Sequence, residues 1–453
     1  MQAVRSFQLS VPISSVGWVP ILAIGLRLAS PTTADASYLL LGAFALTGRV
    51  QAIQALALSW FFTFFNSGIT SLGPYSSLGR YVVILGAAVS VLMRSDFLKS
   101  GKMPDRLISF TILLAAFVVI HSILFSIMPD ISLLKIVSWV IPVVTLLAAW
   151  SRLSLNKVKQ LSDWLYAALV LIMVLSLPLI AFPVGYSITG TAVIGVIGHP
   201  QAFGITMSVL GAWTVGRMFA QHPPPWTSII ILGLCLALIV LSETRTAGLG
   251  LVLGVAMAMI ISPLIAGKPL RKIAPGLLSR RFQIIIFISV FAAVAAGSQA
   301  TSIVTDYISK GRRAQVTGVL EAYDDSRGRL IDEMWQNFEN NPWTGIGFGL
   351  PSDLYEFNVV RDPFLGLPIA APIEKGVAPI MVLEELGIVG AVMVLVWVWM
   401  LFRRAAARGI ASLTLLATIL LLNFGEAGLL SSGGIGLLYL VAISWAVARP
   451  TDR

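Results

Sequence analysis

The sequence is poor in charge, cysteine and histidine, and these shortages narrow what the protein can be. Only 11% of its 453 residues are charged, whereas about a quarter is usual in a soluble protein. The single cysteine, Cys235, lies within an apolar run, which excludes an internal disulfide and a cysteine-based metal site. The three histidines are far apart, and no cluster has the spacing of metal ligands. We therefore expect no metal and no cofactor.

Long hydrophobic runs take the place of charge. Hydrophobic residues make up 57% of the chain, and apolar runs of about 18 to 20 residues, enough to cross about 30 Å of hydrocarbon, recur along it. The pattern predicts an all-α, polytopic integral membrane protein of about 12 to 14 transmembrane helices. The expected spans are 12–29, 37–48, 51–70, 81–93, 107–127, 132–150, 164–183, 202–220, 226–242, 246–266, 282–298, 377–402, 408–422 and 428–447.

Lysine and arginine residues mark one side of the membrane. They gather near residues 94–106, 152–159, 217, 268–281 and 403–408, which all fall on the same side if the spans alternate. By the positive-inside rule that side is the cytoplasm, and both termini lie there. The net charge of +10 therefore reflects topology first, and no nucleic-acid partner is expected.

The opposite side carries the long loop of the chain. We divide the sequence into a transmembrane bundle (1–298), a large outer loop with short helices (299–376) and C-terminal transmembrane helices (377–453). Long loops are translocated regardless of their charge. Within this loop, SRGRLIDEMWQNFENNPWTGIGFG (326–349) predicts an amphipathic helix, capped by Ser326 or Asp325, followed by an irregular glycine turn.

Arginines stand at two outer positions where the charge rule gives no reason for them. Arg245 lies in the corner SETRTAG between two spans, beside Glu243, which we expect to orient it by pairing. Arg327 and Arg329 fall in the first turn of the predicted loop helix, where the helix dipole disfavours cations. Arginines next to unpaired helix N–H groups form a good phosphate site. The alternative is that they pair in water with the two aspartates before them.

The TRTA corner, the SRGRLIDEMWQNFENNPWTGIGFG helix and turn, and EELGIVGAVMV (384–394) follow one another along the outer side of the chain. In this order they resemble the O-antigen ligase and Wzy-type O-antigen polymerase superfamily, and HPQAFGI (199–205) is similar to a short proline-containing element of that family. Its members are integral membrane glycosyltransferases that use polyprenyl-diphosphate-linked sugars. The resemblance covers about residues 190–400.

The resemblance implies roles for individual residues. Arg245 matches the family arginine of the corner, and Arg327 or Arg329 matches the arginine that begins the loop helix; the spacing does not decide between the two. These arginines are expected to hold the diphosphate. The sequence departs from the family at Gly376, eleven residues before Gly387, where ligases carry a histidine followed by an asparagine.

Without that histidine, another group must accept the proton of the attacking hydroxyl. Glu374 is the nearest carboxylate, and we predict it as the catalytic base, with Lys375 beside it to assist a phosphate or to pair with it. Asp362 and Glu356 are weaker competitors. Alternatively, Glu374 and Lys375 are only a polar edge to the next span.

Several further residues are assigned to the site. We predict substrate-binding roles for His199, Glu243, Arg361 and Lys375. For His199, entry into the helix that begins at Pro200 explains the residue equally well. The neighbouring glutamates of EELG, Glu384 and Glu385, fit acceptor binding and structural pairing equally.

The sequence therefore predicts a metal-independent membrane glycosyltransferase that acts on the outer, periplasmic face of a bacterial inner membrane. It would transfer oligosaccharide from a polyprenyl-diphosphate carrier to a growing glycan, with a chain-length regulator protein as a further partner. The absent histidine favours a polysaccharide polymerase over an O-antigen ligase that acts on a lipid A-core-type acceptor. A transporter or flippase of lipid-linked glycan is the alternative from another class, but it would carry ionisable residues deep in its spans.

Overall fold

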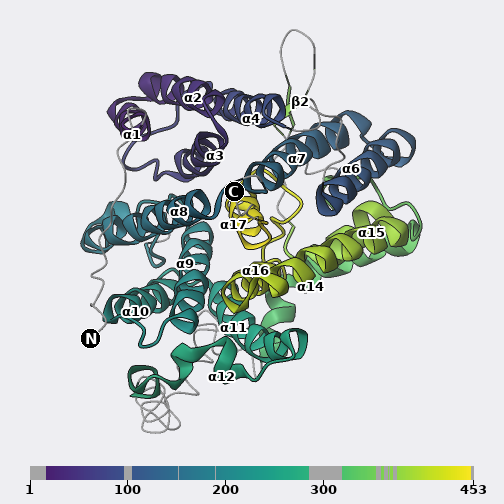
Figure 1. The fold of residues 1–453 in the computed structure, drawn as a ribbon. Helices are drawn as coiled ribbons and strands as arrows, with labels where there is room; N and C mark the ends of the chain where they lie inside the picture. Colours follow the sequence, from purple (N-terminus) through teal and green to yellow (C-terminus); the bar gives the residue numbers. More distant parts are fainter. Residues whose placement is uncertain are drawn as a thin grey trace.

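The computed structural model describes residues 17–95, 105–151, 153–188, 190–284, 319–353, 359–361, 366, 368–370 and 375–449. Within them the secondary structure is nearly all helix, joined by loops (Figure 1). The helices are α1 (Val19–Ala29), α2 (Pro31–Leu46), α3 (Arg49–Phe64), α4 (Ser76–Met93), α6 (Arg106–Phe125), α7 (Pro129–Trp150), α8 (Leu155–Ser176), α9 (Pro200–Ala220), α10 (Trp226–Leu241), α11 (Arg245–Ala266), α12 (Leu270–Ile273), α14 (Val319–Asn340), α15 (Ala378–Arg408), α16 (Ile410–Leu422) and α17 (Gly436–Ala446).

Short elements fill some of the connections. Three 3₁₀ turns occupy Pro178–Ala181, Pro183–Gly185 and Pro275–Leu278. The strands β1 (Val360–Arg361) and β2 (Pro368–Ala370) form a small antiparallel pair in the long loop.

The predicted fold class is confirmed. Among the described residues, six helices are long and apolar enough to cross a membrane: α4, α6, α7, α8 with the turn after it, α11 and α15. Shorter apolar helices are α1, α10, α16 and α17. Every predicted span overlaps a named helix except 282–298, most of which lies outside the described residues.

The outer surface of the bundle is apolar, as a lipid-facing surface must be. Large aliphatic side chains stand exposed along the helices, for example Leu264 at 77% and Ile21 at 69%. In water such a surface would be an aggregation hazard. Facing hydrocarbon, it needs no other partner.

Helix α9 is surrounded by other helices and packs against α8, α10, α11 and α16. It is buried on nearly every face from Ala202 to Phe219. Small residues permit this close packing, as is usual in membrane bundles. A side chain at Gly216 of α9 would collide with α16, its Cβ falling 2.8 Å from the Ala411 Cα.

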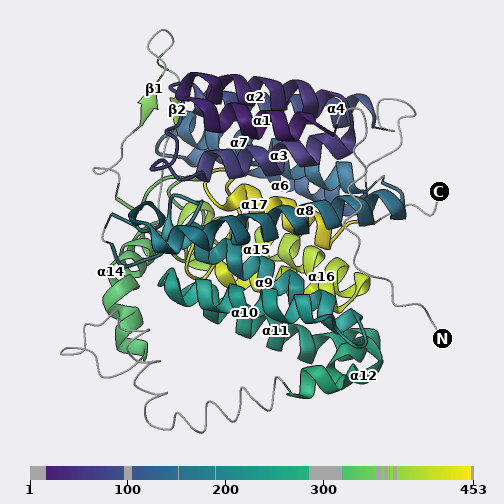
Figure 2. The ribbon, with the colours of Figure 1, turned by 90° about the vertical axis from the view of Figure 1, so that its left-hand side faces the viewer.

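The loops at one end of the bundle are tied to one another. Asn66 donates from Nδ2 to the carbonyls of Val184 (2.7 Å) and Gly195 (2.8 Å). The Ile127 amide donates to Ile346 (3.1 Å). In Figure 2, α14 and the β1–β2 pair lie towards this end and α12 lies at the other. The residues assigned to the outer side by the charge pattern therefore gather in one place.

Several helices differ from their predicted limits, and the starts of α8 and α17 differ most. Helix α8 begins at Leu155 rather than near residue 164, so it includes Lys157 and Lys159. Lysine and leucine are good helix formers, and they extend a helix past the end of its apolar stretch. Helix α17 begins at Gly436 rather than 428. The residues between α16 and α17 form a loop, because their glycines and serines favour turns despite an apolar average.

Candidate active site

The core of the site is a break in helix α15. At Gly387 the backbone has φ 62° and ψ −170°, which interrupts the helix. The Ile388 amide therefore donates to Pro342 (2.8 Å), outside the helix. The Glu384 and Glu385 carbonyls are available to partners from elsewhere in the chain. The EELG motif is thus a helix break that exposes backbone hydrogen-bonding groups.

The glycine turn NPWTGIGFG is the partner of this break. Ile346 donates to the Glu384 carbonyl (2.9 Å), and Gly347 donates to the Glu385 carbonyl (3.0 Å). The contact is too close for a side chain at Gly387, where a Cβ would lie 2.3 Å from the Trp343 carbonyl. Two motifs that are separate in the sequence therefore form one unit.

Lys375 lies between two buried glutamates. Its Nζ is 2.6 Å from Glu384 Oε2 and 3.0 Å from Glu385 Oε1, and the residues are 8%, 0% and 2% exposed. The remaining carboxylate oxygens are also satisfied: Asn337 of α14 donates to Glu384 (2.8 Å), and the Gly349 amide donates to Glu385 (2.7 Å). This triad joins α14, the glycine turn and α15.

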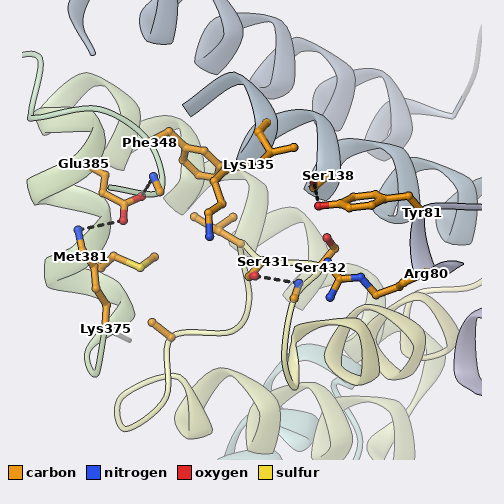
Figure 3. Close-up of a pocket in the computed structure, with 15 residues that line it drawn as sticks. Arg80, Tyr81, Lys135, Ser138, Phe348, Lys375, Met381, Glu385, Ser431 and Ser432 are labelled. Atoms are coloured by element: carbon orange, nitrogen blue, oxygen red, sulfur yellow. Dashed lines mark hydrogen bonds and ion pairs between the residues drawn. The ribbon is translucent and has the colours of Figure 1, made fainter. Parts of the chain in front are cut away.

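A cavity of about 110 Å³ opens beside the triad. Figure 3 shows Lys135 between the Lys375–Glu385 side and the Arg80 side of this cavity. Arg80 lies with its guanidinium 5.3 Å from the Tyr81 ring centroid, and Ser138 donates to the Tyr81 hydroxyl (3.3 Å). The lining residues are Arg80, Tyr81, Leu134, Lys135, Ser138, Phe348, Gly349, Lys375, Met381, Glu385, Ala427, Leu430, Ser431, Ser432 and Gly433. Hydroxyls and cations therefore dominate the polar lining.

The corner that carries Arg245 is tightly built. Ser242 and Thr244 are buried, and Thr244 donates from Oγ1 to the Pro200 carbonyl (3.0 Å) at the start of α9. Glu243 between them is exposed and adopts the left-handed φ of 54°, which is uncommon for a residue with a side chain. Arg245 is the first residue of α11. A cation there is disfavoured by the helix dipole, so helix stability does not explain it.

The loop between α16 and α17 connects the corner to the cavity. At one end of the loop, Gly425 packs against Thr246, beside Arg245, so closely that a Cβ would lie 2.1 Å from the Thr246 Cγ2. Two residues later, the Ala427 amide donates to the Lys375 carbonyl (3.1 Å). Asn423 holds the loop by accepting from the amides of Gly428 (2.9 Å) and Leu429 (2.8 Å). The Arg245 corner and the Lys375 triad therefore flank one ordered loop.

The structure places the other predicted residues in different ways. His199 is exposed and precedes Pro200, so it lies next to the Arg245 corner and at a helix entry. Arg361 is exposed and forms an ion pair with Asp130 at 2.7 Å, and neither residue lines the cavity beside the triad. Glu374, Glu356 and Asp362 lie outside the described residues. Glu384 and Glu385 do pair structurally, through Lys375.

The predicted start of the loop helix is wrong. Helix α14 extends from Val319, so Arg327 and Arg329 lie well beyond its first turn, and neither Ser326 nor Asp325 caps it. The preceding VLEA stretch contains strong helix formers, which carry the helix further back. Positions 327 and 329 lie on different faces, because residues two apart do not share a helix face. Position 327 falls on the face of Met334, which is 1% exposed.

Arg80, Lys135 and the loop after α16 were not predicted as parts of the site. A signal was present for Lys135, because it lies within the predicted span 132–150 and a charged residue in an apolar span is a functional candidate. Arg80 directly precedes the predicted span 81–93. Arg80 is four residues after the start of α4 and Lys135 six after the start of α7. The loop itself gave no such signal.

The fold and the site define a class: a multi-pass helical membrane protein with a polar, cation-rich site at one end of its bundle. Residues 230–368 match the family model described as O-antigen ligase. A comparison with curated proteins finds no match. The family match confirms the resemblance to the O-antigen ligase and polymerase superfamily. The family is one of glycosyltransferase-like membrane enzymes that act on lipid-linked glycans.

Proposed function

We propose that the protein is a membrane glycosyltransferase that extends a glycan by transferring oligosaccharide from a polyprenyl-diphosphate carrier. The observation that carries this proposal is the unit formed by the glycine turn, the EELG break and the Lys375 triad, beside the Arg245 corner. The family match covers the corner and the turn. The Arg245 corner and the Lys375 triad both flank the loop between α16 and α17.

The reaction follows from the donor. An acceptor hydroxyl oxygen attacks the anomeric carbon of the donor sugar, and the bond from that carbon to the phosphate oxygen breaks. The electron pair leaves with the lipid diphosphate, and the hydroxyl proton passes to a base. Arginine stabilises a departing diphosphate by charge and by paired hydrogen bonds. We assign this role to Arg245 together with Arg327 or Arg329, and the position of 327 on the buried face of α14 favours Arg327.

The base remains assigned to Glu374. It adjoins Lys375, whose ion pairs with Glu384 and Glu385 fix the backbone at the edge of the site. A carboxylate at this place would take the role of the histidine that Gly376 replaces. We assign substrate binding to Lys375, to Glu243 and to His199 at the neighbouring helix entry. Arg361 is assigned to the periphery of the substrate site.

The lack of the ligase histidine favours a polymerase over a ligase. The experiment that tests the function uses purified protein in lipid nanodiscs with native lipid-linked repeat units and no other acceptor. A polymerase gives longer lipid-linked chains. A ligase gives product only when a separate lipid acceptor is added. If neither addition yields a new glycosidic bond, the transferase proposal is wrong.

We further propose that the site faces the outside of a bacterial inner membrane. The basic loops at the opposite end of the bundle support this orientation. In a Cys235→Ser background, cysteine at Ile188, which is fully exposed, should react with an impermeant thiol reagent added to intact cells. Cysteine at the exposed Lys268 should react only after the membrane is opened. Reaction of both in intact cells would contradict the topology.

A further inference from the structure

The cavity beside the triad is built mainly by helices outside the family-matched segment. Arg80 comes from α4, Lys135 from α7, and Lys375 precedes α15. Residues 230–368, which carry the family match, contribute only Phe348 and Gly349. The family match therefore does not by itself assign a role to this cavity.

The charges that line the cavity are unbalanced. Its lining includes three cations, Arg80, Lys135 and Lys375, and one carboxylate, Glu385. Glu384 also pairs with Lys375 but does not line the cavity. Among the residues that the structure describes, the buried Arg80 Nε finds no hydrogen-bond partner. An unpaired buried donor is costly, so an acceptor is expected there.

The depth of the cations supports a binding role. At a rise of about 1.5 Å per residue, Arg80 and Lys135 lie about 6 and 9 Å inside the ends of their helices. A cation inside a membrane helix, even within its first two turns, is costly and is a candidate for function. The Lys135 stem packs on the glycine turn, where a Cβ at Gly349 would lie 2.7 Å from its Cγ. The lysine is thus held in place beside the triad.

The size and the other lining groups indicate the ligand. A cavity of about 150 Å³ holds a benzene ring, so one of about 110 Å³ takes a group somewhat smaller than a six-membered ring. A carboxylate or phosphate substituent meets that limit. The hydroxyls of Tyr81, Ser138 and Ser431 suit the neighbouring hydroxyls of a sugar.

We propose that this cavity binds an acidic substituent of the glycan, a carboxylate or phosphate group on a sugar, separately from the donor diphosphate. The inference rests on the proposed function, because it takes the ligand to be part of the glycan substrate. The ordered loop from Asn423 to Gly433 lies between this cavity and Arg245. The protein would therefore have two anion subsites, and the second would select acidic repeat units.

The test measures binding of small probes to the purified full-length protein in nanodiscs, without any lipid carrier. The probes are glucuronate, methyl glucoside and inorganic pyrophosphate, followed by ligand-observed NMR titration. We expect glucuronate to bind at least about 10-fold more tightly than methyl glucoside, because charge-assisted hydrogen bonds are stronger than neutral ones. Lys135→Gln should weaken glucuronate binding about 10- to 100-fold. Arg245→Gln should weaken pyrophosphate binding and leave glucuronate binding unchanged.

Control variants separate the loss of a charge in the cavity from a general loss of charge and from misfolding. Lys157→Gln removes an exposed cation at the opposite end of the bundle and should change neither affinity. Arg80→Gln repeats the test from another helix if Lys135→Gln does not fold, and Lys135→Arg should retain binding. Equal glucuronate affinity in the parent and in the folded Lys135 or Arg80 variants overturns the inference. Loss of pyrophosphate binding alone in these variants also overturns it and assigns the cavity to the donor diphosphate.

Different results would contradict the anion cavity and the proposed transferase function. Glucuronate binding that depends on Lys135, without any chain extension, counts against the transferase function and not against the anion cavity. Chain extension by a protein that does not bind glucuronate counts against the cavity alone. Carboxyl-reduced repeat units give a second readout, since they should raise KM more than they lower kcat.

Discussion

Removing Lys375 should expose how strongly the triad holds the site together. Lys375→Met leaves the Glu384 and Glu385 carboxylates, 0% and 2% exposed, without the ammonium that lies 2.6 and 3.0 Å from them. Their remaining donors, the Asn337 amide and the Gly349 backbone, carry no charge. Methionine fills much of the same volume, so the change tests charge rather than packing.

The expected cost is large. Removing one partner of a buried ion pair costs about 3–5 kcal/mol, because the charge left behind is uncompensated. Two carboxylates about 5 Å apart also repel by about 3 kcal/mol at an effective dielectric constant of about 20, a cost that protonation of one of them limits. For 453 residues, an unfolding entropy of about 2.1 cal/mol/K per residue gives about 1 kcal/mol per degree. Lys375→Met should therefore lower Tm by about 3–5 °C.

The assay is thermal unfolding in one detergent, followed by tryptophan fluorescence. Adding Glu384→Gln to Lys375→Met should restore at least about 1 kcal/mol, because one of the two uncompensated charges is removed. Lys157→Met, which changes an exposed lysine, should stay within about 0.5 kcal/mol of the parent. If Lys375→Met is as stable as Lys157→Met, or if the two triad changes simply add, the triad does not hold the site as described.

Three further variants test other parts of the site. Gly387→Ala should abolish chain extension, because its Cβ would lie 2.3 Å from the Trp343 carbonyl. The control Gly409→Ala, also at a positive φ but with nothing within 4 Å of the added Cβ, should retain chain extension. Equal activity of the two variants would refute the proposed packing of the glycine turn against Gly387. Arg245→Lys keeps the charge but loses the paired hydrogen bonds, so the chain-extension rate should fall by about 10-fold or more with normal insertion; a normal rate would make the corner structural only. Arg327→Gln should lower that rate more than Arg329→Gln, and the reverse order would contradict the assignment of Arg327 to the diphosphate.

The helical bundle could be predicted from the sequence because membrane spans are local. A run of apolar residues predicts a helix that crosses the membrane, and the positions of lysines and arginines predict which end of that helix faces the cytoplasm. The ends of helices were less predictable. The start of α17 at Gly436 and the extension of α14 to Val319 depend on turn and helix preferences that an apolar average hides.

The site was predictable only in part, because its contacts are long-range. The sequence singled out Lys375 beside Glu374, and Glu384 and Glu385 separately at the start of the next span. The pairing of Lys375 with the two glutamates comes from the structure. The sequence also predicted an irregular turn at the GIGFG glycines. It did not show that this turn hydrogen-bonds to the break at Gly387, since no local pattern reports a contact across about 40 residues. Lys135 carried a signal as a cation within a predicted span, but nothing local showed that it lies beside Lys375.

The measurement that tests the central claim most directly is the stoichiometry of carrier release. Purified protein is incubated with lipid-linked repeat units, and free polyprenyl diphosphate is measured alongside new glycosidic bonds. The account predicts one diphosphate released for each bond formed, with both falling together by about 100-fold or more in Arg245→Ala, since removing one stabilising donor typically costs about that factor. Movement of intact lipid-linked units across the membrane without diphosphate release would contradict it and indicate a transporter.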